Sequence, residues 1–373
     1  MPGERETALM RRDRLPLTYD ESRARFHRAA VEAALPVTSH AISARGPAGQ
    51  ELTIDVVAVG PERPHHALVV LSGVHGVEGF VTSAMQCDLL GRLDVGSLPA
   101  ELGVLVVHAV NPWGMAWWRR QNESNVDLNR NWRRDEISPP RNEAYAELHP
   151  IACPDTPDLP DVADMLVAAS ALVAERGLAW VRDGITVGQY EHADGLHFGG
   201  DRTEESNRVL EGIVEERLAG IERALVVDLH TGHGPPGQIT LLSDAPPGSE
   251  QDQFFRRHFP TAKVEATTDN PDATTGVKVG QIANGIRESL VGAECWSTSL
   301  EVGTTRDEEQ LAATYQEQWV HRRGDRTRAD HAAAVWAYRC CFTPDDPEWE
   351  AIALEQGARQ LDDALTAIQH PRQ

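Results

Sequence analysis

The chain has 373 residues, of which 41% are apolar and 25% are charged, which is the composition of an ordinary globular protein. Its 57 acidic residues outnumber its 35 basic ones, and the formal charge of −22 argues against a general nucleic-acid or anionic-membrane binder. With 30 glycines and 23 prolines the chain is neither fibrous nor disordered. The length suits one large α/β domain or two smaller ones.

The first residues carry charges throughout, so we expect residues 1–18 to form a mobile or loosely packed tail and not a secretory signal peptide. No run of apolar residues approaches the length of about 18 that a membrane span needs. The five cysteines include no CxxC pair, which favours reduced thiols over a disulfide framework or a thiolate metal site. The expected location is therefore the cytoplasm.

The first predicted helix begins with Asp20 as its cap and runs to about Ala34, and a polar strand follows over Glu51–Val59. Covering helices are expected over Phe80–Leu90 and Arg202–Leu218. Between them lie short, continuous apolar runs, which are typical of strands buried on both faces. These runs are Ala67–Leu71, Val104–Val110, Ala224–Leu229 and Ile239–Leu242. The pattern predicts an α/β fold, a three-layer α/β/α sandwich with a mixed, mainly parallel central sheet.

Residues 133–165 depart from this pattern because they are rich in proline and acid, and we interpret them as an insertion loop before a helix near Ala163–Arg176. The last predicted helix, within residues 346–373, carries one apolar face. That face consists of Leu354, Ala358, Leu361, Leu365 and Ile368. It is expected to pack on the chain's own domain, with a partner helix as the alternative. The predicted division is a tail, a catalytic domain over 19–345 and this C-terminal helix.

The segment VVLSGVHGVEGF, residues 69–80, places His75 and Glu78 in a glycine-rich turn after a buried strand. In open α/β sheets, binding sites form beyond the carboxyl ends of strands. An imidazole and a carboxylate are both zinc ligands, and the glycines let the backbone bend so that both face one point. Phosphate binding is disfavoured, because the spacing is GxxGxxG, no Lys-Ser/Thr follows, and Glu78 would repel a phosphate.

A basic island follows the next buried strand. Residues 117–134 contain five arginines against Glu123 and Asp127, so the local charge is +3 in an acidic chain. Arginine holds carboxylates through two parallel hydrogen bonds, and Asn129 beside Arg130 adds an amide donor. The island indicates a carboxylate-binding site, and a solvated loop with scattered salt bridges is the alternative.

Two later strands end in polar residues. The segment ALVVDLHTGHG, residues 224–234, places His230 at the end of a strand, where it can complete a set of two histidines and one glutamate. His233 is the competing ligand, but it follows Gly232 in the loop. In STSLEVG, residues 297–303, Glu301 lies in an apolar strand, where an idle carboxylate is costly. A carboxylate near a zinc-bound water can take its proton, so Glu301 is a candidate base.

Together these segments resemble the zinc carboxypeptidase superfamily, which also contains aspartoacylase and succinylglutamate desuccinylase. The sequence is most similar to its bacterial DUF2817 branch. The resemblance covers roughly residues 50–305 and rests on four ordered motifs. These are HGVEG, NPWG with RRQNESNVDLNRNW, VVDLHTGHG and SLEVGT. It implies a zinc carboxypeptidase-like fold and one zinc ion per chain.

The resemblance also implies roles for single residues. His75, Glu78 and His230 would be the zinc ligands, and Glu301 the general base. Asn129 and Arg130 would hold the substrate carboxylate. The arginine that polarises the scissile carbonyl would be Arg120 or Arg119, with Arg120 preferred. Asp127 would fix the tautomer of the first zinc histidine.

The sequence also departs from the digestive enzymes of this superfamily, since the stretch between Asn129 and His230 is longer and holds the insertion. Tyr190, in the segment 188–200, is the candidate for the tyrosine that closes over the substrate. The predicted function is zinc-dependent amide hydrolysis of a small N-acyl amino acid or short peptide with a free carboxylate, without nucleic-acid or membrane partners. A true carboxypeptidase, an ester hydrolase and a non-catalytic binding protein are the alternatives.

Overall fold

The computed structural model describes residues 15–270 and 278–370, and in this part of the chain one eight-stranded sheet forms the centre of the fold. The strand order is β1-β2-β4-β3-β5-β8-β6-β7. The strands are β1 (Thr38–Arg45), β2 (Glu51–Val59), β3 (His66–Leu71), β4 (Leu102–His108), β5 (Arg223–Gly232), β6 (Ile239–Ser243), β7 (Lys263–Ala266) and β8 (Glu294–Gly303).

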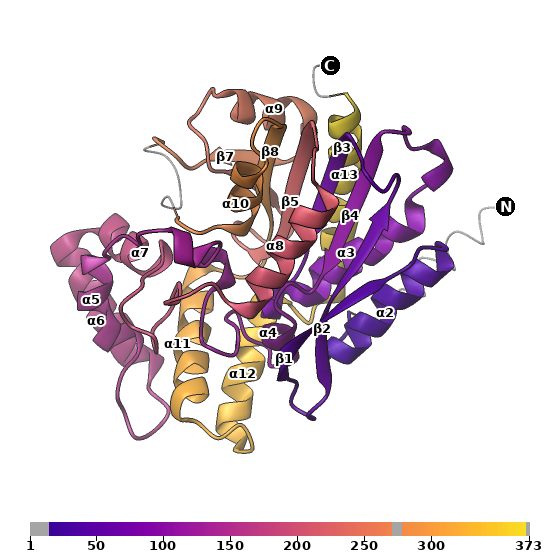
Figure 1. Ribbon diagram of the computed structural model, residues 1–373. Coiled ribbons are helices and arrows are strands. Elements are labelled where there is room, and N and C mark those ends of the chain that lie inside the picture. Colours follow the sequence, from indigo (N-terminus) through magenta and orange to yellow (C-terminus); the bar gives the residue numbers. More distant parts are fainter. Residues whose placement is uncertain (1–14, 271–277, 371–373) are drawn as a thin grey trace.

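The sheet is mixed and mainly parallel. The four pairs β4–β3, β3–β5, β5–β8 and β6–β7 are parallel, while β1–β2, β2–β4 and β6–β8 are antiparallel. Helices cover both faces (Figure 1), which confirms the predicted three-layer α/β/α architecture. Parallel strands need this double cover, and it explains the continuous apolar runs in the sequence.

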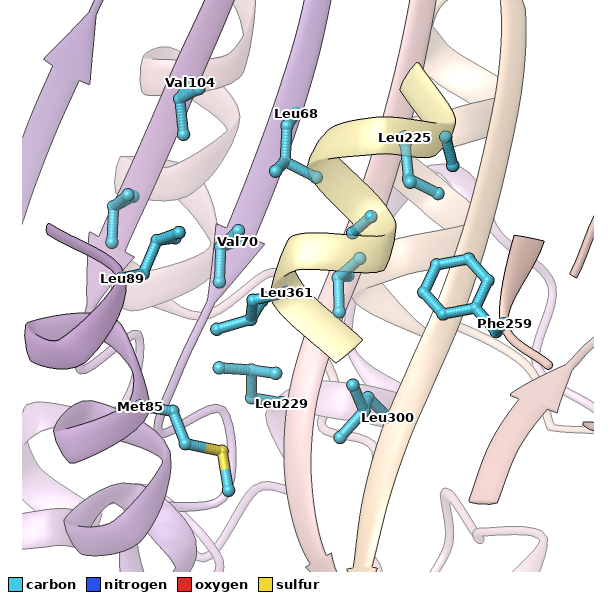
Figure 2. Close-up of a cluster of buried hydrophobic side chains, with 14 of the residues drawn as sticks. Leu68, Val70, Met85, Leu89, Val104, Leu225, Leu229, Phe259, Leu300 and Leu361 are labelled. Atoms are coloured by element: carbon cyan, nitrogen blue, oxygen red, sulfur yellow. The ribbon is translucent and has the colours of Figure 1, made fainter. Parts of the chain in front are cut away.

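One face of the sheet packs against α2 (Tyr19–Glu32), α3 (Gly79–Arg92), α9 (Glu250–His258) and α13 (Pro347–Gln369). Figure 2 shows Leu361 of α13 among Val70 and Leu229 of the sheet, with Met85 of α3 beside them. The opposite face packs against α8 (Glu205–Arg217) and α10 (Ile282–Ser289). Alternate residues of each central strand therefore face two different cores.

The remaining helices lie beside and below the sheet in Figure 1. They are α4 (Pro112–Ala116), α5 (Glu143–Ala152), α6 (Val162–Arg176), α7 (Leu178–Thr186), α11 (Asp307–Arg323) and α12 (Ala329–Phe342). The helices α5, α6 and α7 form a group at one side, and α11 and α12 lie together near the carboxyl ends of β3 and β5. Among the described residues, none of the helices combines the length and the apolar character that a membrane crossing needs.

Several predicted boundaries were wrong. The first helix begins at Tyr19, because Thr18 accepts the hydrogen bond from the Glu21 N–H and is the cap in place of Asp20. The predicted insertion loop contains helix α5, whose cap is Asn142 and which tolerates Pro150 in its interior. The predicted tail reaches into the core, since Leu15 is buried, while residues 1–14 lie outside the described residues.

Other predictions were close to the structure. Strand β2 has the predicted bounds, and the predicted helix over Arg202–Leu218 is α8, which begins at Glu205. The apolar face of α13 packs on the chain's own sheet, as expected. The buried face of α13 is rotated slightly about the helix axis from the predicted one. The side chains of Leu361 and Ile368 are buried, and those of Leu354 and Leu365 are only partly buried.

We predict that Leu361→Ala lowers the free energy of unfolding by about 2–5 kcal/mol, because it leaves a cavity between α13 and the sheet. Leu361 is fully buried at 0% exposure. Urea unfolding followed by circular dichroism measures the change. The control is Glu355→Ala on the same helix, whose side chain is 69% exposed and whose loss leaves no cavity. Equal unfolding midpoints for the two variants would contradict the assigned packing of α13.

Candidate metal centre

The loop after β3 brings His75 and Glu78 inward. Gly73 has a φ of 63°, a left-handed conformation that glycine adopts without strain. A Cβ atom on Gly76 would lie 2.0 Å from the backbone carbonyl carbon of Gly114, so only glycine lets the two segments pass this closely. His75 and Glu78 are 4% and 2% exposed, and both therefore lie inside the protein.

Three side chains converge at the carboxyl ends of β3 and β5. His75 Nδ1 lies 2.8 Å from Glu78 Oε1, and His230 Nδ1 lies 3.0 Å from Glu78 Oε2. The two Nδ1 atoms are 3.1 Å apart, and the two imidazole planes are tilted by 54°. The structure thus brings together the three predicted ligands, with His230 in preference to His233.

The far side of each imidazole faces a carboxylate. His230 Nε2 is 2.6 Å from Asp228 Oδ2, and His75 Nε2 is 3.4 Å from Asp127 Oδ1. The Asp228 carboxylate can keep a proton on His230 Nε2, which leaves the lone pair of Nδ1 free to point at the shared centre. His75 Nε2 only faces Asp127 and makes no hydrogen bond with a described residue. Asp127 was predicted in this position, whereas Asp228 was missed. Asp228 could have been recognised from the sequence, because it lies two residues before His230 and residues two apart in a strand lie on the same face.

The arrangement fits a bound cation. Burial by itself raises the pKa of Glu78, but the adjacent His75 and His230 rings hold it below its usual value. Burial likewise opposes ionisation of Asp127, yet Arg120, followed by Arg130, keeps its pKa well below its usual range. Without a metal, protons on the two rings offset the charge of Glu78. A bound cation would take the place of those protons and meet both Nδ1 lone pairs and the carboxylate. Two histidines and one glutamate are a ligand set that suits zinc and leaves a coordination position for water or substrate.

The two candidate arginines occupy different environments. Arg120 donates from Nε to Asp127 Oδ2 at 3.0 Å, and its Nη1 lies 3.5 Å from Glu78 Oε1, with the side chain 16% exposed. Arg119 has no exposed surface, and it pairs with Glu317 and Gln318 of α11. The structure therefore places Arg120 beside the candidate ligands and Arg119 in the packing of α11.

Asn129 and Arg130 follow Asp127 in a short turn and are also buried. Asn129 Oδ1 accepts the Ile282 N–H, and the Arg130 guanidinium donates to three backbone carbonyls. Those carbonyls belong to Asn129, Thr186 and Val187. Tyr190 donates from its hydroxyl to the Arg130 carbonyl at 2.8 Å. Much of the hydrogen-bonding capacity of Asn129 and Arg130, the predicted carboxylate site, is therefore already used by the backbone around them.

Glu301 lies directly opposite His230 in the parallel register of β5 and β8. Leu300 and Val302 belong to the core under α13, so Glu301 points to the opposite face, as His230 does. Its carboxylate accepts the His233 N–H at 3.4 Å and is only partly buried. The predicted base therefore lies on the same face of the sheet as the candidate ligand His230.

Two further side chains near the centre were missed. His197 approaches Asp127 Oδ2 with its Nδ1 at 3.2 Å, and burial lowers the pKa of its ring to about 4. Burial, followed by the charge of Arg130, lowers the pKa of Lys278 to about 7, while Glu301 acts in the opposite direction. His197 lies in the segment 188–200 that was considered for Tyr190, but its role was not recognised there, and Lys278 lies outside every motif that the sequence analysis used.

A second cluster of potential metal ligands lies among the described residues, formed by His149, His192 and Asp194. The two rings stack at 4.1 Å with planes only 20° apart, so their in-plane lone pairs run side by side. Asp194 is also paired with Arg322. This geometry suits a packed surface cluster better than a metal site.

Comparisons with known proteins bear on the family. The family described as "Protein of unknown function (DUF2817)" matches residues 16–356. No curated protein matches the chain. Among solved structures, a metallo-carboxypeptidase from Burkholderia cenocepacia matches with a TM-score of 0.42 and 14% identity, covering 82% of this chain and 68% of that one.

Two other matches have similar values. Bovine thrombin-activatable fibrinolysis inhibitor, solved with tick carboxypeptidase inhibitor, gives a TM-score of 0.45 and 12% identity, covering 86% and 95% of the two chains. A metallo-carboxypeptidase from Pseudomonas aeruginosa, bound to (2-guanidinoethylmercapto)succinic acid, gives 0.43 and 13%, covering 92% and 69%. At these identities and scores the likeness says nothing about the substrate.

We predict that Asp228→Asn weakens zinc binding by about 10–100-fold, because the carboxylate no longer fixes the tautomer and orientation of His230. Competition with a chromogenic chelator measures the affinity. The control is Asp252→Asn, which changes a buried carboxylate of α9 away from the centre and should leave zinc binding unchanged. Zinc affinities within twofold of each other in the two variants would contradict this role for Asp228.

Proposed function

The chain belongs to the DUF2817 family, and we propose that it is a zinc-dependent hydrolase that cleaves an amide bond in a small, carboxylate-bearing substrate. The substrate is an N-acyl amino acid or a short peptide. The observation that carries the proposal is the convergence of His75 Nδ1, Glu78 and His230 Nδ1 on one point, with each imidazole backed by a carboxylate. This donor set would hold one zinc ion per chain.

When bound, zinc supplies a Lewis acid that lowers the pKa of a water and polarises a carbonyl. Glu301 takes a proton at its carboxylate and returns it to the leaving nitrogen, which a partly exposed glutamate on the His230 face of the sheet can do. Arg120, fixed by Asp127, supplies positive charge where the oxyanion develops. Because its partners hold it in place before the substrate arrives, this charge needs no rearrangement during the reaction.

The carboxylate of the substrate is assigned to Arg130, with Asn129 and Tyr190 beside it. Three of the five N–H donors of Arg130 are used by backbone carbonyls, so the position of the guanidinium is fixed. Among the described residues, the other two N–H groups, both terminal, have no assigned acceptor and remain for a ligand. A guanidinium kept charged in a buried site attracts a carboxylate more strongly than an exposed one does. Arg119 is left out of this assignment because Glu317 already pairs with it.

Two alternatives differ in what the site does with a ligand. A carboxypeptidase would prefer peptides to N-acyl amino acids, and a screen of both classes separates these activities. A non-catalytic binding protein would bind zinc and a carboxylate ligand without turnover. The presence of Glu301 next to His230 favours an enzyme over a binding protein, since a binding site has no need of a carboxylate there.

The metal ligands and the base are distinguished by their variants. We predict that His75→Ala loses bound zinc, measured by metal analysis of purified protein, with little change in fold.

We predict that Glu301→Gln keeps about one zinc per chain while kcat falls at least about a hundredfold, because a positioned base contributes typically 10²–10⁴-fold.

Glu294→Gln is the matched control for the base, since it makes the same change at the other end of β8, where Glu294 pairs with Arg223. Its kcat should equal that of the unmodified protein. Full zinc occupancy in His75→Ala would sink the ligand assignment. Loss of zinc in Glu301→Gln would make Glu301 a ligand or a support, and an unchanged kcat would move the base to another residue such as Glu191.

The carboxylate requirement is tested on the substrate. We predict that converting the free acid of a good substrate to its primary amide lowers kcat/KM at least about tenfold, because charge-assisted hydrogen bonds to Arg130 contribute about 1.5–3 kcal/mol each. Steady-state kinetics on the matched acid and amide measure the ratio. Equal turnover of the two would rule out the carboxylate role of Arg130 and Asn129.

A further inference from the structure

His197 lies in a loop that is held in one conformation. Side-chain amides bind the loop backbone, with Asn125 donating to the carbonyls of Ala193 and Gly195 and Asn131 donating to that of Gly199. The φ angle of His197 is 50°, a left-handed backbone conformation that is uncommon for a residue with a side chain. Backbone strain of this kind persists where the surrounding structure enforces it, and it is concentrated at functional sites.

The ring of His197 has one nitrogen committed and one left for a ligand. Its Nδ1 lies 3.2 Å from Asp127 Oδ2, the oxygen that also receives the Arg120 Nε–H. In this contact Nδ1 is assigned as the donor and the carboxylate oxygen as the acceptor, so the Nε2 atom of the neutral ring carries the lone pair. The side chain is 13% exposed, so the ring can be reached from solvent.

The surroundings of this lone pair restrict what it can recognise. Arg120 donates to the same Asp127 oxygen that His197 Nδ1 faces, and Tyr190, from the same loop as His197, donates to the Arg130 carbonyl. The ring therefore lies near two charged donors. The lone pair of Nε2 cannot donate to the oxygen of an anion, and it can only accept a hydrogen bond from an N–H or O–H group. In an N-acyl amino acid, the group between the scissile carbonyl and the carboxylate is the amide N–H.

We propose that His197 is a specificity-determining residue, whose Nε2 accepts a hydrogen bond from the scissile amide N–H when the substrate spans Arg120 and Arg130. The inference rests on the proposed function, which assigns the scissile carbonyl to Arg120 and the substrate carboxylate to Arg130. Its consequence is a preference for amides over the corresponding esters, which carry an oxygen atom in place of the N–H. An ester would place two acceptors opposite each other and leave the lone pair of His197 unpaired.

The test is His197→Asn, which separates the two sides of the ring. The asparagine amide can donate to Asp127 as Nδ1 does and tolerates the left-handed backbone, but it lacks the Nε2 acceptor. The probes are N-benzoylglycine and its ester counterpart benzoyloxyacetic acid. Binding is measured by calorimetry in the zinc-loaded Glu301→Gln background, where turnover is suppressed. Kinetics of the otherwise unmodified protein and of its His197→Asn variant are measured in parallel.

We expect the Glu301→Gln protein to bind the amide about fivefold to tenfold more tightly than the ester, and His197→Asn to bring that ratio close to one. The matched control is His192→Asn, the same change on the same loop at a ring that stacks on His149 outside the metal centre. It should leave the ratio unchanged. An undiminished ratio in His197→Asn, a ratio near one before the substitution, or no binding of either probe would overturn the proposal.

The failure of the proposed function gives a different result. If the unmodified protein hydrolyses neither probe but the binding ratio behaves as expected, the hydrolase assignment fails and His197 still selects the ligand. If both probes are hydrolysed and His197→Asn slows them equally, the hydrolase assignment stands. In that case His197 only positions Asp127 and Arg120, and the selectivity proposal is wrong.

Discussion

The buried carboxylates around the two imidazoles impose the constraint on which the rest of the site depends. Glu78, Asp127 and Asp228 are all at most 2% exposed, and each lies within a few ångströms of a histidine nitrogen. Burying an ionised carboxylate is costly unless opposite charge and hydrogen bonds compensate for it. The structure supplies that compensation from one side through Arg120, and a dication at the shared point would supply it from the other.

This constraint explains why Asp127 occupies the centre of the hydrogen-bond network. One of its oxygens faces His75 and accepts the Asn129 N–H, while the other receives Arg120 and His197. A single carboxylate thereby contacts a candidate metal ligand, a candidate oxyanion donor and a candidate substrate acceptor. Because all three depend on one buried group, small displacements of Asp127 would affect each of them, and the surrounding turn is accordingly tightly packed.

Much of the scaffold could be predicted from the sequence, because local patterns determine it. The apolar runs gave the central strands, and the glycine turn gave the position of His75 and Glu78, since backbone conformation and strand period act over a few residues. Asp228 could have been found by the same period of two. The family match over residues 16–356 agrees with the resemblance drawn from the four motifs.

The rest depended on contacts between distant segments. The difference between Arg119 and Arg120 is set by Glu317, which lies 198 residues after Arg119 and removes it from the site. Nothing near either arginine in the sequence indicates this pairing. The helix α5 was missed because its proline and acidic residues resemble a loop, although Asn142 caps it and Tyr145 packs beneath it. In both cases tertiary packing overrides the local pattern.

The basic island shows how a correct observation can support more than one role. The +3 charge of residues 117–134 suggested a carboxylate-binding site, yet the arginines of this island have several different partners. Arg133 pairs with Glu215 on the surface, Arg134 lies over the ring of Tyr190, and Arg130 binds three carbonyls of the backbone. Most of this positive charge therefore holds the loops in place. Since those loops include residues 188–200, the same arginines that stabilise the scaffold also hold Tyr190 and His197 beside the candidate metal centre. Under the proposed function, binding and folding here depend on one set of charges.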